Sequence, residues 1–95
     1  MLDRIVIIEL EVIEQIEAEP KGRPLFWVCD LIQRMGRSDP LAVLHGMWLG
    51  GYVGFVDNEG QTIPQWKCAE LFRKNDNSVP VRVVTTALGS SWVHG

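Results

Sequence analysis

The pattern of apolar and polar residues predicts two helices in the N-terminal half of the chain. Residues 24–36 carry apolar side chains at helical spacing, and Pro24 suits the first turn of a helix. Residues 39–50 repeat this pattern after a short polar turn, where Ser38 or Asp39 is expected to cap the second helix. Two helices joined by a tight turn form a candidate helix-turn-helix.

The segment before them, residues 3–18, combines features of a helix and of a strand. Leu10, Ile13 and Ile16 recur at helical spacing, in a stretch rich in helix-forming residues. Its first half gathers β-branched residues and then alternates apolar with polar positions, which is typical of a strand. We favour a helix that ends before Pro20 and keep a strand as the alternative.

The second half predicts a β-hairpin that is interrupted by a helix. Residues 52–56 are typical of a strand, and the polar run 57–60 predicts a turn. Residues 61–63 are expected to return as a short strand before a helix over 64–74. Residues 79–86 then alternate apolar and polar positions, which indicates a half-buried strand.

Two side-chain caps are expected in this half of the chain. The spacing from Thr62 to Gln65 suits a capping box at the start of the helix over 64–74. Thr86 suits the cap of a final helical turn, which the sequence ALGSSWVHG continues.

Length and composition predict one globular domain, residues 1–95, with one core. Hydrophobic residues make up 46% of the 95 positions and charged residues only 22%, which disfavours disorder. No apolar stretch approaches the roughly 20 residues of a membrane-spanning helix, so no membrane partner is expected. Cys29 and Cys68 form no C-x-x-C pair, and we expect reduced thiols in a cytoplasmic protein.

The net charge of −3 hides an asymmetry along the chain. Residues 1–20 carry six acidic residues and one basic residue, which gives −6 + 1 = −5. Residues 21–95 carry eight basic and six acidic residues, which gives +8 − 6 = +2. The N-terminal segment is therefore acidic, and the remainder is much less basic than a strong nucleic-acid binder.

The residue types that catalysis or metal binding requires do not occur together in the sequence. The two histidines, His45 and His94, form no ligand cluster with the cysteines, and Ser38 and His45 lie seven positions apart with no local group to align them. The glycines after His45 match neither a phosphate-binding loop nor a dinucleotide fingerprint. We therefore predict a non-enzymatic protein without metal or cofactor.

Two short motifs lie at the boundaries of the predicted hairpin. Residues 48–53 are WLGGYV, and residues 81–89 are VRVVTTALG, with Thr86 and Gly89 near their end. Together with the order of the predicted elements, they resemble winged helix-turn-helix domains of the bacterial multiple-antibiotic-resistance-regulator type. In that family a Gly-Leu-Val helix end feeds the wing, and a Val-x-Leu-Thr-x-x-Gly motif follows the closing strand.

This resemblance implies a small α+β domain in which three N-terminal helices precede a β-hairpin, the wing. Two departures from the family pattern stand out. The turn and helix from Gly36 to Gly51 are about two residues shorter than usual, and the extra helix over 64–74 interrupts the wing.

In such a domain the helix over 39–50 would enter the major groove of double-stranded DNA. Its solvent side offers few groups that read base edges, so phosphate contacts would dominate. The alternative is that the basic residues are ordinary solvated charges and that the histidine lies at the edge of the core. The candidate nucleic-acid-binding residues are Arg34, Arg37, Ser38, His45, Lys74 and Arg82.

The sequence therefore leaves two functions open. The first, slightly preferred from the sequence, is a DNA-binding transcriptional regulator that forms a homodimer through residues 3–18. The second is a winged-helix-like protein-interaction module, such as a phage-encoded or accessory inhibitor, that uses exposed tryptophan and apolar surface. The four tryptophans and the weak basicity favour this second function.

Overall fold

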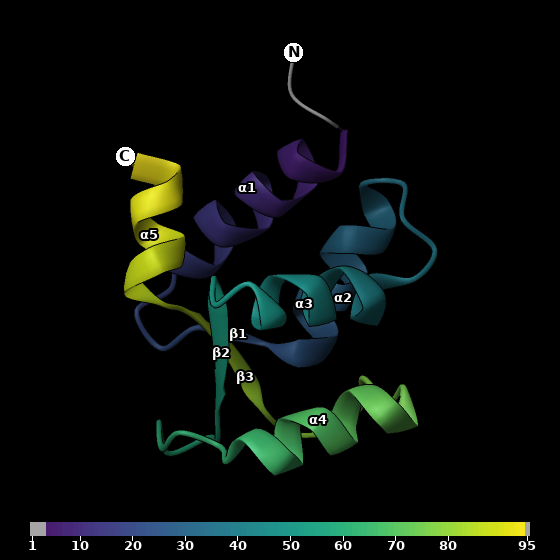
Figure 1. Ribbon diagram of the computed structural model, residues 1–95, viewed down its shortest axis with the longest axis vertical. Coiled ribbons are helices and arrows are strands. Elements are labelled where there is room, and N and C mark those ends of the chain that lie inside the picture. The colour runs from purple at the N-terminus through teal and green to yellow at the C-terminus, as the bar shows by residue number, and fades with distance from the viewer. Residues whose placement is uncertain (1–3, 95) are drawn as a thin grey trace.

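The computed structural model describes residues 4–94 and the side chains of residues 6–94. Figure 1 shows an α+β arrangement in which helices surround a small antiparallel sheet. α1 lies toward one end of the longest axis of the molecule and α4 lies at the other. The three strands are β1 (Arg23–Pro24), β2 (Val53–Val56) and β3 (Arg82–Thr85).

The N-terminal segment is a helix, α1 (Arg4–Glu17), which confirms the helical prediction for the described part of residues 3–18. Ile8, Val12 and Ile16 are buried along one of its faces and pack into the core. Burial of this face outweighs the β-propensity of the branched residues.

The predicted pair of helices is present as α2 (Leu25–Arg34) and α3 (Pro40–Leu49). The two helices pack on each other and contribute buried side chains such as Ile32 and Leu44 to the core. Two details of the prediction are wrong. Pro24 belongs to β1 and precedes the helix, and the Asp39 side chain makes no capping hydrogen bond.

β3 is the central strand of the sheet, whose order is β1-β3-β2. Both neighbours run antiparallel to it, and Val83 is opposite Phe55 on one side and Arg23 on the other. Val83 and Phe55 are buried, so this register directs both side chains into the core. β1 was not predicted, because a strand of two residues leaves no alternation to detect.

The connection from β2 to β3 contains the predicted turn and the predicted helix, α4 (Gln65–Lys74). The Asp57 carboxylate accepts hydrogen bonds from the backbone N–H groups of Glu59 and Gln61, at 2.8 and 2.9 Å. The expected return strand is reduced to an isolated bridge between Val56 and Thr62. The capping box is wrong, because the residue at the N-cap is Pro64 and no side chain caps the helix.

The chain closes with α5 (Ala87–His94), which packs against α1. The predicted cap at Thr86 is confirmed, because its hydroxyl accepts a hydrogen bond from the Gly89 N–H at 3.1 Å. The same hydroxyl donates to the Gly51 carbonyl at 2.5 Å and so joins the start of α5 to the end of α3. A Cβ at Gly89 would lie 2.2 Å from the Tyr52 carbonyl oxygen, so only glycine fits this contact.

Candidate functional site

The two arginines predicted to contact phosphate near the helix-turn-helix are both paired with carboxylates. Arg34 binds Asp30 one turn earlier on α2 at 3.0 Å, and Arg37 binds Asp39 across the turn at 3.5 Å. Residues 25–50 contain no other acidic or basic residue apart from His45, so their charges sum to +2 − 2 = 0. This pair of helices, α2 and α3 with the turn between them, therefore attracts polyanions such as DNA only weakly.

The other two predicted cations also bind groups of the protein itself. Lys74 approaches Glu70 at 3.5 Å, and Arg73 binds the same carboxylate. Arg82 donates to the carbonyl oxygens of Lys21 and Gly22, at 3.0 and 2.7 Å. Arg82 is therefore a structural residue that holds the loop between α1 and β1 on the sheet.

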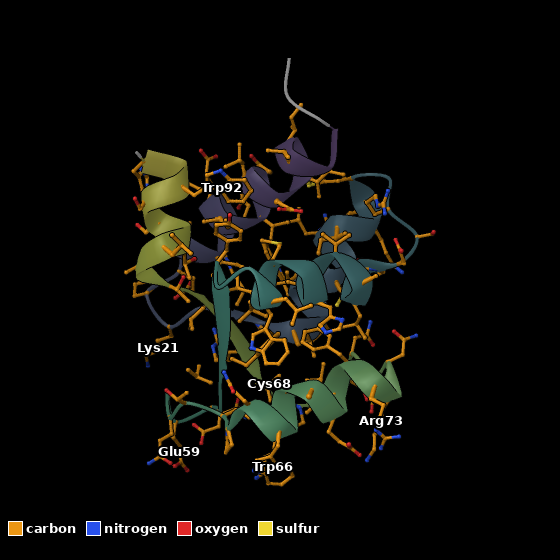
Figure 2. The ribbon with its side chains drawn as sticks, viewed as in Figure 1. Lys21, Glu59, Trp66, Cys68, Arg73 and Trp92 are labelled. Carbon is orange, nitrogen blue, oxygen red and sulfur yellow. The ribbon has the colours of Figure 1, made fainter. Side chains whose placement is uncertain are left out.

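The structure brings only some of the predicted site residues together. Ser38 and Asp39 share a pocket with Asn75 and Asn77, which follow Lys74 in the loop after α4. Arg82 belongs to another region, where its side chain contacts the loop that contains Lys21, labelled in Figure 2. Arg82 therefore lies against the loop between α1 and β1, whereas Arg34 and Arg37 flank the turn between α2 and α3.

The solvent-facing side of α3 is smooth and uncharged. Ala42, Gly46 and Leu49 are exposed along this side, and Leu49 is 69% exposed. A Cβ at Gly46 would meet no atom within 4 Å, so packing inside the protein does not require this glycine. This side of α3 can make apolar contacts, but it carries no side chain that could hydrogen-bond to base edges.

His45 lies between α3 and α4, with its ring half-buried. It stacks on Phe72 at a centroid distance of 4.6 Å and on Trp48 at 6.0 Å. Phe72 in turn contacts Phe55 edge-to-face at 5.6 Å. The histidine is thus part of the aromatic contact that holds α4 on α3, in agreement with the alternative that placed it at the edge of the core.

Exposed apolar side chains are the more prominent surface feature. Trp66 on α4 points away from the body of the molecule (Figure 2), whereas the other three tryptophans are half-buried. Lys67 lies over the Trp66 ring at 5.5 Å from its centroid. The number of tryptophans in the sequence indicated exposed apolar surface, but nothing in the sequence indicated which apolar residues other than tryptophan would be exposed. The large apolar side chains that are at least 51% exposed are Ile7, Phe26, Leu49, Trp66 and Leu88.

The two cysteines are free, buried thiols. Burial raises the pKa of Cys29 to about 11, against a smaller opposing effect of a hydrogen bond with Asn77. Burial also raises the pKa of the Cys68 thiol. Neither thiol has the lowered pKa that a nucleophilic cysteine requires.

Charged and metal-ligating groups elsewhere support packing. His94 on α5 contacts Glu17 on α1 at 2.7 Å, and hydrogen bonds from Ser90 and His94 lower the pKa of this carboxyl.

Within residues 4–94, no three His, Cys, Asp or Glu side chains lie close enough together to hold a metal ion. None of the helices in this range combines the length and apolarity that crossing a membrane requires.

Comparisons with protein-family models, with curated proteins and with solved structures gave no match. Within residues 4–94 the chain forms a compact α+β fold of five helices and a three-stranded antiparallel sheet.

Proposed function

We propose that the chain is a non-enzymatic, winged-helix-like binding module that recognises another protein. The order of elements supports the winged-helix comparison: α1, α2 and α3 precede the antiparallel strands β2 and β3, and α4 lies in the connection where the wing is expected. Fold alone does not define a partner, so the proposal depends on the surfaces that the fold presents.

The observation that carries the proposal is the character of the exposed side of α3. In a DNA-binding winged helix this side would meet the major groove, where arginine, lysine, asparagine and glutamine provide base and phosphate contacts. Here Ala42, Gly46 and Leu49 occupy it, and α3 contains no arginine or lysine at all. A smooth apolar helix side is better suited to another protein surface, where apolar anchors provide most of the binding energy.

The distribution of charge supports the same choice. Arg34, Arg37 and Lys74 each have a carboxylate partner, and Arg82 bonds to backbone carbonyls. Exposed ion pairs are weak and exchange readily, but the neighbouring carboxylate stays in place and repels phosphate. The α2–α3 unit therefore gains little attraction for DNA.

Fluorescence anisotropy with duplex DNA tests this proposal. Labelled duplexes of random and of promoter sequence are titrated with micromolar protein at about 50 mM salt, where phosphate contacts are strongest. We expect no saturable binding. Saturable, salt-dependent binding at these concentrations would contradict the proposed function.

The order of the elements favours one second candidate, a DNA-binding regulator. In this function Arg34, Arg37, Lys74 and Arg82 contact phosphates, and four contacts imply a log–log salt slope of about −3.6 at most per protomer. Ser38 and His45 complete its contact set, and a homodimer through residues 3–18 is its proposed assembly. Arg37→Ala is then expected to weaken binding to every sequence alike and to lower the slope by about one unit.

A further inference from the structure

An apolar groove runs between α1 and α2. Its volume is about 470 Å³, and it is open to solvent along one side. Ile7 is 51% exposed at one end, whereas the other apolar walls are half-buried. The lining residues are Ile7, Leu10, Glu11, Glu14, Leu31 and Met35.

The helical spacing explains why these residues line one groove. On α1, Ile7, Leu10, Glu11 and Glu14 follow one another at i, i+3, i+4 and i+7, which places them on one helix face. Leu31 on α2 and Met35, the residue that ends this helix, are one turn apart. The groove is therefore apolar at its floor and acidic along the part of α1 nearer its C-terminal end.

We propose that this groove binds a basic amphipathic helix of a partner protein. The inference rests on the proposed function, since it assigns a surface and a partner chemistry to a protein-binding module. From Ile7 to Glu14 the wall spans eight residues, or about 10 Å at the helical rise per residue. That length matches the anchors at i, i+3 or i+4, and i+7 through which a helix occupies a groove.

The charge of the rim selects the partner. Glu11 and Glu14 line the groove, and neither carboxylate forms an ion pair with a side chain that the structure describes, although Gln15 donates a hydrogen bond to Glu11 at 3.1 Å. Lysine or arginine beside the apolar anchors of a bound helix would meet these carboxylates at the edge of the contact. A second copy of α1 would instead bring another acidic segment against the first, and like charges across an interface oppose association.

The apolar side chains that line the groove can accommodate helices whose anchor side chains differ in shape. Met35 is unbranched and polarizable, so it adjusts to anchors of different outline. Leu31 and Leu10 provide the more rigid apolar contacts beside it. The groove therefore favours a class of partner, defined by apolar spacing and positive charge.

A synthetic peptide provides the test. The probe is a labelled amphipathic helix of about 18 residues, with leucine at i, i+3, i+4 and i+7 and lysine on the flanks, long enough to form a helix. Its counterpart has glutamate in place of lysine. We expect saturable binding of the lysine peptide to the full chain below about 100 µM and no binding of the glutamate peptide.

Matched variants separate the groove from general attraction to an acidic protein. Ile7→Ser and Glu14→Lys are each expected to weaken binding about five- to tenfold, as truncation of an interface anchor does. The controls make the same changes elsewhere: Leu88→Ser at a similarly exposed leucine and Glu59→Lys in an exposed turn. Neither control is expected to change the affinity by more than about twofold.

The outcomes distinguish the groove from the proposed function. The groove would be the wrong binding site if Glu14→Lys and Glu59→Lys weakened peptide binding equally. The same would follow if Leu88→Ser weakened binding and Ile7→Ser did not. Either result would leave a protein-binding function on another surface. Sedimentation that detects a homodimer disrupted by Ile7→Ser would also overturn the basic partner. The DNA titration described above tests the proposed function independently of these results.

Discussion

The imidazole of His45 on α3 stacks on the phenyl ring of Phe72 on α4, with 4.6 Å between the ring centroids and 20° between the planes. α4 has few other contacts with the helices, so this pair and the neighbouring Trp48 are the main link between α3 and α4. In this position the histidine helps to hold α4 on α3. The stacking has a direct consequence for stability.

Phe72→Ala is expected to lower the free energy of unfolding by about 2–3 kcal/mol. The ring is half-buried, so the loss falls at or below the lower end of the range for buried phenylalanine. Urea unfolding followed by tryptophan fluorescence measures it. Trp66→Ala on the exposed side of the same helix is the control and should change stability by no more than about 0.5 kcal/mol. Equal effects of the two variants would show that Phe72 does not hold α4 in place.

Arg82→Ala is expected to destabilise the fold by about 2–4 kcal/mol, because it removes two charge-assisted hydrogen bonds to the Lys21 and Gly22 carbonyls. Arg82→Lys should recover only part of this loss, since one ammonium group does not reproduce the guanidinium fork. Arg34→Ala is the control, because its exposed ion pair contributes at most about 1 kcal/mol. Thermal melts that rank the two alanine variants equally would contradict a structural role for Arg82.

Two glycines inside helices are expected to respond to alanine in opposite directions. Gly46→Ala on α3 should stabilise the protein by about 0.5–1 kcal/mol, because open space surrounds the new methyl group and alanine favours a helix. Gly89→Ala on α5 should destabilise it by at least about 2 kcal/mol, because the methyl group would lie 2.2 Å from the Tyr52 carbonyl oxygen. Chemical denaturation of both variants measures the difference. A stabilising Gly89→Ala would contradict the close contact between α5 and the Tyr52 carbonyl.

Alkaline pH is expected to destabilise the protein in part through Cys29. A thiol in an unfolded chain ionises near pH 8.5, whereas burial raises the pKa of Cys29 in the folded protein to about 11. The unfolded state therefore releases this proton first, and the free energy of unfolding falls as pH rises from about 8.5 to about 11. Cys29→Ala should flatten this slope. Identical pH slopes for the two proteins would show that the thiol does not contribute.

Most of the helices could be predicted because their cause is local. The apolar spacing in residues 24–36 and 39–50 requires one buried face, and α2 and α3 bury that face in the structure. The ambiguous segment 3–18 became a helix because Ile8, Val12 and Ile16 share a face that the rest of the fold covers. Here tertiary burial decided between two local preferences.

The features that the sequence did not predict depend on partners distant in the sequence. Arg82 was offered as a candidate phosphate contact, and nothing in the sequence indicated that it also binds carbonyl groups about 60 positions earlier in the chain. β1 forms because β3 is available as a neighbour, and its two residues carry no signal of their own. The groove between α1 and α2 likewise appears only when Leu31 and Met35 lie beside Ile7.

The position of β3 constrains the order in which the chain acquires its structure. It is the last strand along the sequence and also the central one, so neither β1 nor β2 has a sheet neighbour until residues 82–85 are available. During synthesis β1 and β2 therefore cannot pair in the sheet until β3 has been made, and α1, α2 and α3 pack mostly against one another. The sheet then closes in one late step. Newly made chains that stop before β3 should expose the Phe55 side of β2 and become substrates for chaperones or proteases.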